Sequence, residues 1–146
     1  MNIMRFLTPK SNVAYLDSLA TVRNGFEKMT FHKYRAIPVI SSDGVYVGTV
    51  TEGDLLRSML QNGGSDMREH EKVCIKDVIR EGWNPAVNVM CTVDRLFNRV
   101  AEQNFVPVVD DRGVFIGIVT RKAVLTYLTD IYEKTKKDKD VDDEKA

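Results

Sequence analysis

The chain alternates short apolar runs rich in β-branched residues with longer segments in which apolar residues recur every three or four positions. Two of the short runs, beginning at Ile37 and Val106, share an apolar-Pro-Val pattern. Each is followed by a polar turn ending in glycine and by a second apolar run. This order is typical of a β-hairpin. The sequence therefore predicts hairpins over residues 37–51 and 106–120.

Each predicted hairpin lies between two segments with helical spacing of apolar residues, so one helix is expected before it and one after it. The apolar positions are Val22, Phe26 and Met29, then Leu55, Leu56, Met59 and Leu60, around the first hairpin, and Val93, Phe97 and Val100, then Val124, Leu125, Leu128 and Ile131, around the second. With a first strand near Ala14 or Val87, each unit reads β-α-β-β-α, which places the chain in the α/β (α+β) class.

The two units are copies of one another. Residues 37–56 align with 106–125 without a gap, with 8 identical pairs in 20 and five conservative apolar exchanges. Upstream, the correspondence continues as 12–14 with 84–86 and as 3–7 with 75–79. Nearly the whole chain is therefore a tandem repeat, the feature to look for before a fold is assigned.

Composition sets the boundaries of the repeats. Glycine, serine and charge replace apolar spacing after the first repeat, so we expect repeats at 1–61 and 73–132 joined by a linker at 62–72. The remainder, 133–146, has five lysines against six acidic residues and is predicted to be a disordered, solvated tail.

The overall composition is that of a soluble globular protein, with 146 residues, 43% hydrophobic and 29% charged. Lys plus Arg (21) equals Asp plus Glu (21), so the chain has no net positive charge that would favour binding to nucleic acid. No apolar run has the length of a membrane span, and the N-terminal apolar stretch is too short for a signal peptide. The protein is therefore expected to be cytoplasmic, with Cys74 and Cys91 reduced.

Each hairpin ends in Gly-x-x-Thr at the junction with the next helix, at 48–51 and 117–120. Together with the tandem β-α-β-β-α units and the apolar-Pro-Val runs, this motif resembles a pair of CBS domains (named after cystathionine β-synthase) over about residues 3–132. The resemblance implies a regulatory module without catalytic activity. It also implies repeats packed with pseudo-two-fold symmetry, two clefts for adenosine-containing ligands, and a homodimer.

The motif around Asp54 has two interpretations. Thr51 and Asp54 have the spacing of a capping box, in which both side chains satisfy free N–H groups at a helix start. The family resemblance also implies that the Asp54 carboxylate accepts hydrogen bonds from a ribose. Both interpretations remain open from the sequence.

The second repeat departs from this motif. Ala123 stands where the aspartate would be, and Arg121 and Lys122 occupy the first helical turn, where cations oppose the helix dipole. A bound phosphate, gripped by the planar Arg121 fork with Lys122 beside it, would relieve this repulsion. Alternatively, both side chains extend into solvent.

The family resemblance assigns residues to both clefts. The first would join Asn12, Val13, Ala14, Tyr34, Arg35, Ala36 and Ile37 to Thr120, Arg121 and Lys122, and the second would join Asn84, Pro85, Ala86, Asn104, Phe105 and Val106 to Thr51 and Asp54. Because the first cleft collects the cations, a multiply charged ligand should prefer it. Ala14 and Ala86 either allow a purine to approach closely or are ordinary core alanines.

Similarity to small stand-alone bacterial CBS pairs suggests cyclic di-AMP as the ligand, while AMP, ADP or ATP would suit the same adenine pocket. The nucleotide would be a regulatory ligand, no catalytic cofactor is expected, and the signal would pass to a separate, unidentified target protein. A rival interpretation is an interaction module without nucleotide, with a partner surface at Tyr15, Phe31, Tyr34 and Trp83. His70 and Cys74, four residues apart, supply only two ligands for a metal.

Overall fold

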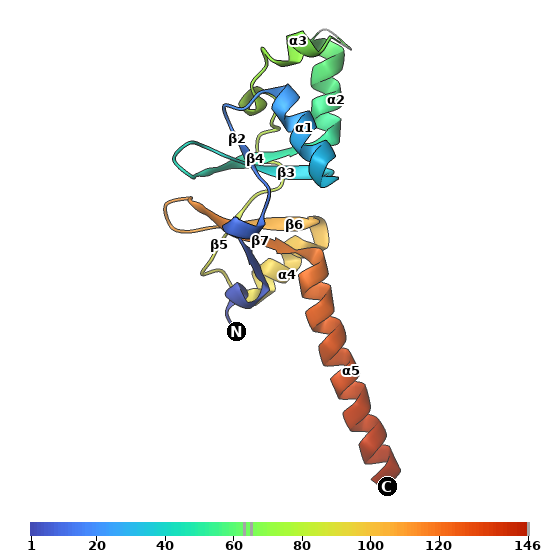
Figure 1. The fold of residues 1–146 in the computed structure, drawn as a ribbon. Coiled ribbons are helices and arrows are strands. Elements are labelled where there is room, and N and C mark those ends of the chain that lie inside the picture. Colours follow the sequence, from blue (N-terminus) through green and yellow to red (C-terminus); the bar gives the residue numbers. More distant parts are fainter. Residues whose placement is uncertain (63, 65, 146) are drawn as a thin grey trace.

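The computed structural model describes residues 1–62, 64 and 66–145, and two sheets lie next to each other at the middle of the molecule (Figure 1). Gly63 and Ser65 of the predicted linker and Ala146 of the predicted tail lie outside the described residues. The helices are α1 (Val22–His32), α2 (Glu52–Gln61), α3 (Met67–His70), α4 (Val93–Glu102) and α5 (Arg121–Lys145). The strands are β1 (Leu7–Pro9), β2 (Leu16–Asp17), β3 (Ala36–Ile40), β4 (Tyr46–Thr51), β5 (Val87–Asn88), β6 (Phe105–Val109) and β7 (Phe115–Thr120).

Both repeats have the predicted β-α-β-β-α order. In the first sheet β2 lies parallel to β3, which pairs antiparallel with β4; in the second, β5 lies parallel to β6, which pairs antiparallel with β7. The register of each hairpin shifts at equivalent places, between Val39 and Ile40 and between Val108 and Val109. The predicted fold class and duplication are confirmed.

A symmetric pair of hydrogen bonds joins the two hairpins. The backbone N–H of Tyr46 donates to the Gly113 carbonyl at 3.1 Å, and that of Phe115 donates to the Gly44 carbonyl at 2.9 Å. Each residue of one bond lies 69 positions from its counterpart in the other, which is the offset of the sequence repeat. The repeats therefore meet about an approximate two-fold axis, with the rings of Tyr46 and Phe115 stacked at 6.3 Å.

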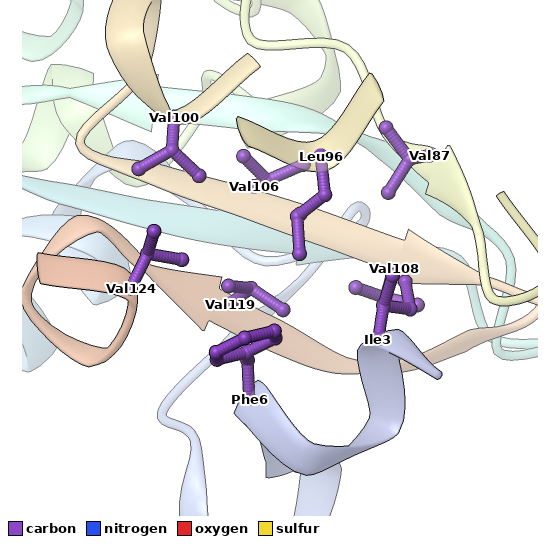
Figure 2. Close-up of a cluster of buried hydrophobic side chains, with 9 residues drawn as sticks. All are labelled: Ile3, Phe6, Val87, Leu96, Val100, Val106, Val108, Val119 and Val124. Atoms are coloured by element: carbon purple, nitrogen blue, oxygen red, sulfur yellow. The ribbon is translucent and has the colours of Figure 1, made fainter. Parts of the chain in front are cut away.

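The short segments that precede the first strand of each repeat are exchanged between the two cores. The 3-10 helix Ile3–Phe6 contributes Ile3 and Phe6 to the core of the second repeat (Figure 2), and β1 pairs with β7 at the edge of the second sheet. The 3-10 helix Ile75–Asp77 places Ile75 in the core of the first repeat. Each core therefore includes a short segment of the other repeat, and similarity between the repeats does not report which core such a segment joins.

The segment after residue 133 is helical as far as Lys145, so the prediction of a disordered tail is wrong. Its composition is polar, but it contains neither proline nor glycine, and it continues a helix whose start packs on the second repeat, so the cost of nucleation is already met. Opposite charges four residues apart, such as Glu133 with Lys137, add support. The side chains at 131–144 are exposed, as expected for a solvated segment.

No helix among the described residues is both long and apolar enough to cross a membrane.

Candidate functional site

A cavity of about 320 Å³ lies between the two repeats. Its walls come from the N-terminal segment and β3 on one side and from the start of β6 and the end of β7 on the other. The lining residues are Thr8, Asn12, Val13, Ala14, Tyr34, Ala36, Pro38, Asn104, Phe105, Ile118 and Thr120. This volume is at the lower end of the roughly 300–1,000 Å³ found for small-molecule sites.

The walls of this cavity combine apolar surfaces with a few polar groups. Ala14 and Ala36 have small side chains that leave space beside the backbone, and Pro38, Phe105 and Ile118 add apolar surface. The other lining residues include two amides and two threonines. Mostly apolar walls with a small number of placed polar groups are typical of sites for flat heterocyclic ligands.

Six of the ten residues predicted for the first cleft line this cavity, namely Asn12, Val13, Ala14, Tyr34, Ala36 and Thr120. Three others do not. Ile37 is fully buried in the first core, because successive residues of a strand point to opposite faces and Ala36 takes the cavity side. Arg35 lies in a separate hollow with Lys33 and Glu52. Lys122 lies in a groove on the outer side of α5.

The guanidinium of Arg121, the tenth residue, is hydrogen-bonded at the end of α4 and is not free to bind a phosphate with both of its branches. Its Nε donates to the carbonyl of Val100 at 2.9 Å, and its Nη1 donates to Oδ1 of Asn104 at 2.9 Å. A cation at a helix C-terminus donates hydrogen bonds to carbonyls that lack helical partners, and it interacts favourably with the negative end of the helix dipole. The α4 carbonyls, with their partial negative charge, therefore take the place beside Arg121 that a phosphate was expected to occupy.

Five lining residues were not predicted for this cleft. Asn104 and Phe105 were assigned to the second cleft from the family resemblance, but they lie at the first. Pro38 on β3 and Ile118 on β7 face the cavity. The apolar pattern of these strands does not distinguish a residue that lines a cavity from one in the core. Thr8 reaches the cavity only because β1 crosses to the second sheet, for which we found no signal in the sequence.

Asp54 in the second cleft is buried, with 1% of its side chain exposed. Its Oδ2 accepts from the Thr51 N–H at 2.9 Å, and the Thr51 hydroxyl accepts from the Asp54 N–H at 3.1 Å, which completes the predicted capping box. Its Oδ1 accepts from Arg57 and, at 2.8 Å, from Nε of Arg80. Both carboxylate oxygens therefore have partners within the protein.

Arg80 occupies the place in the second repeat that Thr8 holds in the first, by the same offset of 72 that relates Asn12 to Asn84. Its guanidinium bridges Asp54 and the face of the Trp83 ring, 4.4 Å from the ring centroid. A long charged side chain thus fills, in the second cleft, a position that a short threonine leaves open in the first. A polar cavity of about 360 Å³ remains beside it, between α2 and residues 73–80.

A hydrogen-bond network lies in the second cleft next to these residues. The Tyr46 hydroxyl donates to the Asn84 carbonyl at 2.8 Å, Nδ2 of Asn84 donates to the Thr49 hydroxyl at 3.1 Å, and Nε2 of Gln103 donates to Oδ1 of Asn84 at 2.9 Å. Burial raises the pKa of Tyr46 to about 12. The network joins β4 of the first repeat to two segments of the second, so it fastens the repeats together.

Of the predicted residues of the second cleft, Asn84 and Asn104 line a small hollow of about 130 Å³. Val106 is fully buried in the second core. Ala86 and Pro85 are half-buried beside the network, with the Pro85 carbonyl accepting from Gln103 at 3.1 Å. The two clefts are consequently unequal, because the first has mostly apolar walls whereas the polar side chains of the second are hydrogen-bonded to one another.

The remaining candidates are dispersed. His70 is buried, with Nε2 bonded to the Gly64 carbonyl at 2.7 Å, and no cluster of three or more His, Cys, Asp or Glu side chains that could hold a metal occurs in the part of the chain that the structure describes. Among the four aromatic residues, Phe31 is 81% exposed, Tyr34 lines the cavity and Trp83 stacks under Arg80. The Tyr15 ring lies 6.3 Å from that of Phe115. The His32 ring lies between Phe31 and Tyr34, 5.0 Å from the first and 5.2 Å from the second.

Comparison with known proteins gives a family match over most of the chain. The model of the CBS domain matches twice, at residues 4–61 and 73–130. Two curated relatives are a methylated protein of Methanocaldococcus jannaschii (34% identical over 64 residues, 42% of this chain and 37% of the relative) and a homoserine O-acetyltransferase of Methanocorpusculum labreanum (25% identical over 130 residues, 82% of this chain and 24% of the relative). The chain thus spans well under half the length of either.

Solved structures have the same fold. A CbpB in complex with c-di-AMP has a TM-score of 0.85 at 21% identity, covering 94% of this chain and 91% of that chain. The Listeria monocytogenes CbpB in complex with c-di-AMP has a TM-score of 0.80 at 21% identity, covering 90% and 97%. CBSX2 in complex with AMP has a TM-score of 0.71 at 24% identity, covering 90% and 98%. At these identities the likeness shows the fold and not the ligand.

Proposed function

Because this chain belongs to the CBS domain family, with two CBS domains in tandem, we propose that it is a regulatory module that binds an adenosine-containing nucleotide in the cavity between its repeats. The observation that carries this proposal is the 320 Å³ cavity, whose walls are contributed by both repeats. The family is in general regulatory rather than catalytic, which agrees with this role. The nucleotide is proposed as a regulatory ligand.

The walls of the cavity favour a purine base. Ala14 and Ala36 allow a flat ring to approach the backbone, while Phe105, Pro38 and Ile118 offer apolar contact. Thr120 at the edge is the last residue before α5, and its hydroxyl accepts from the Ala123 N–H at 3.0 Å. The positive end of a helix dipole favours a nearby phosphate. Base in the cavity and phosphate toward Thr120 is therefore the arrangement we propose.

The proposed ligands are AMP, ADP, ATP and cyclic di-AMP. Complexes of CbpB proteins with c-di-AMP and of CBSX2 with AMP support both kinds of ligand for this fold. One cavity of this size encloses a single nucleoside, so the second half of cyclic di-AMP would project from the cleft. Because Asp54 and Asn84 of the second cleft are already hydrogen-bonded to Arg80 and Gln103, and the cavity beside them is polar, we propose one ligand site per chain.

The output of the module is proposed to pass through a homodimer to a separate target protein. Exposed apolar side chains lie at equivalent positions on the last helix of each repeat, Leu56 on α2 and Leu125 on α5, and continue with Leu60, Leu128 and Ile131. Such a stripe is suited to a second copy of the chain. For the ligand to act as a signal, it must bind one arrangement of the repeats or the dimer more tightly than another.

A thermal-shift screen tests the proposal. Ligand that binds only the folded state at 100 times its Kd adds about 2.7 kcal/mol of stability, so AMP, ADP, ATP or cyclic di-AMP should raise the unfolding temperature. A nucleotide that shifts the wild type and no longer shifts Tyr34→Ala supports the cavity as the site. No shift with any of these nucleotides would contradict the proposal and favour a module that binds protein partners alone, with the exposed Phe31 as the first residue to substitute.

A further inference from the structure

Asn104 brings a polar side chain of defined orientation to the cavity. It is an exposed residue between the end of α4 and the start of β6, and it lines both the cavity, beside Phe105, and the smaller hollow at Asn84. Its side-chain Oδ1 accepts from Nη1 of Arg121 at 2.9 Å, and its backbone carbonyl accepts from the Arg121 N–H at 2.9 Å. Asn104 is thus held by Arg121 through both its backbone and its side chain.

The Arg121 side chain is itself fixed. Its Nε donates to the Val100 carbonyl at 2.9 Å, and its Nη2 lies 3.4 Å from the Ala101 carbonyl, both in the last turn of α4. These carbonyls have no partners within the helix, so the guanidinium has a structural reason to stay in place. Its planar geometry then sets the direction of Nη1 toward Asn104.

The direction of these bonds decides what Asn104 offers to a ligand. A guanidinium donates hydrogen bonds and accepts none, so the oxygen of the amide must face Arg121. The Nδ2 group is on the other branch of the amide, and it donates to no group among the described residues. Asn104 is therefore oriented as a donor.

We infer that Asn104 is a specificity-determining residue of the cavity, which donates a hydrogen bond from Nδ2 to a ring nitrogen of the bound purine, with Arg121 as the positioning residue that keeps the amide in this orientation. The inference rests on the proposed function. The ring nitrogens of adenine that are not bonded to the sugar are acceptors, which matches a donor at the wall. The apolar neighbours Phe105 and Pro38 place the base, rather than the phosphate, beside this amide.

The sharpest test is calorimetric titration of adenosine, which has no phosphate, into the wild type and Asn104→Asp. Aspartate has nearly the same shape and still accepts from Arg121, but it replaces the donor by an acceptor. We expect adenosine to bind about tenfold more weakly, or worse, without a fall in the unfolding temperature. Asn12→Asp is the matched control, because it introduces the same charge into the same cavity at an amide that Arg121 does not hold, and it should weaken binding less.

Further ligands separate the possible contacts. The three deaza-adenosines each have a carbon in place of one ring nitrogen. The wild type should discriminate against the one that lacks the contacted nitrogen, whereas Asn104→Asp should not. Arg121→Gln should also reduce this discrimination, which a merely structural role of Arg121 would leave unchanged in protein that is still folded.

The outcomes distinguish this inference from the proposed function. If the wild type binds none of the adenine compounds, the proposed function fails. If the wild type binds adenosine and Asn104→Asp binds it equally well, only the role of Asn104 is overturned. If Asn104→Asp weakens AMP but not adenosine, the new charge acts on the phosphate alone, and the assignment of Asn104 to the base is wrong.

Discussion

The carboxylate of Asp54 serves the fold through hydrogen bonds to three other residues. It caps α2 together with Thr51 and holds Arg57 and Arg80. A family resemblance assigns this aspartate to a ribose, but a sugar hydroxyl would have to displace Arg80 or share Oδ1 with it. At this residue, a structural role is already present without any ligand.

Asp54→Ala is therefore expected to destabilise the protein whether or not nucleotide is present. Loss of the cap and of the hydrogen bonds to the two half-exposed arginines should cost about 2 kcal/mol. Urea unfolding of the ligand-free protein measures this change. The Asp54→Asn variant retains a cap acceptor and should lose less; an unchanged midpoint in the alanine variant would show that the carboxylate is reserved for a ligand.

Tyr46 makes folding sensitive to high pH. Because burial raises its pKa to about 12 from the ordinary 10, the folded state keeps the phenol protonated over a range in which the unfolded chain ionises. Its contribution to stability is complete below about pH 10 and is lost as the pH rises toward 12. The unfolding temperature should fall more steeply from about pH 10 to about pH 11.5 in the wild type than in Tyr46→Phe; equal slopes would contradict this role.

Residue roles were predictable from sequence where the chemistry is local. The Thr51–Asp54 capping box consists of hydrogen bonds between side chains and backbone N–H groups three residues apart, and it is present as predicted. Arg121 was predicted to face a phosphate, because its position in the first turn of α5 is visible in the sequence. The carbonyls at the end of α4 that bind it, 21 and 20 residues away in the chain, are not visible there.

At the scale of elements, the two repeats use equivalent strands to build unequal clefts. Position 8 is a threonine and its counterpart at position 80 is an arginine; position 34 is a tyrosine and its counterpart at 103 is a glutamine. The first of each pair lines the cavity; of the second, Arg80 binds Asp54 and Gln103 binds Asn84. The spacing of apolar residues predicted the strands and helices, but the contents of the clefts depend on these individual exchanges.

The C-terminal part of α5 should contribute little to the stability of the core, because its side chains from 131 to 144 are exposed. Lys137→Pro should break the helix there and reduce the helical circular dichroism signal, while the unfolding temperature stays within about 1 °C of the wild type. Lys137→Ala is the control, with the helix retained. A clear drop in unfolding temperature with proline alone would show that this segment packs on another part of the protein.

At the scale of the whole molecule, the two halves are tied together in three ways. The hairpins exchange backbone hydrogen bonds, the segments before the first strands cross between cores, and a polar network occupies the second cleft. The pseudo-symmetry followed from the repeat offset of 69, whereas the exchange of the two 3-10 segments did not, because similarity between the copies is the same whichever core each one joins.

The exposed apolar residues on α5 predict that two copies of the chain form a dimer. Leu128→Glu puts a charge into the proposed interface and should convert a dimer into a monomer in light scattering after size-exclusion chromatography. Val141→Glu adds the same charge on the tail, outside the stripe, and should remain dimeric. A wild type that is monomeric at all concentrations, or a Leu128→Glu variant that remains a dimer, would rule out this surface.

The central claim is that the cavity between the repeats is the nucleotide site, and a calorimetric titration of AMP and cyclic di-AMP into the wild type and Ala36→Phe tests it most directly. The substitution gives the first repeat the side chain that the second repeat carries at the equivalent position, Phe105, and fills the cavity. Arg35→Ala, next to it in sequence but in a separate hollow, is the control. We predict one binding event per chain in the wild type and in Arg35→Ala, and none in a folded Ala36→Phe. Undiminished binding to Ala36→Phe, or two equivalent events per chain in the wild type, would contradict the account.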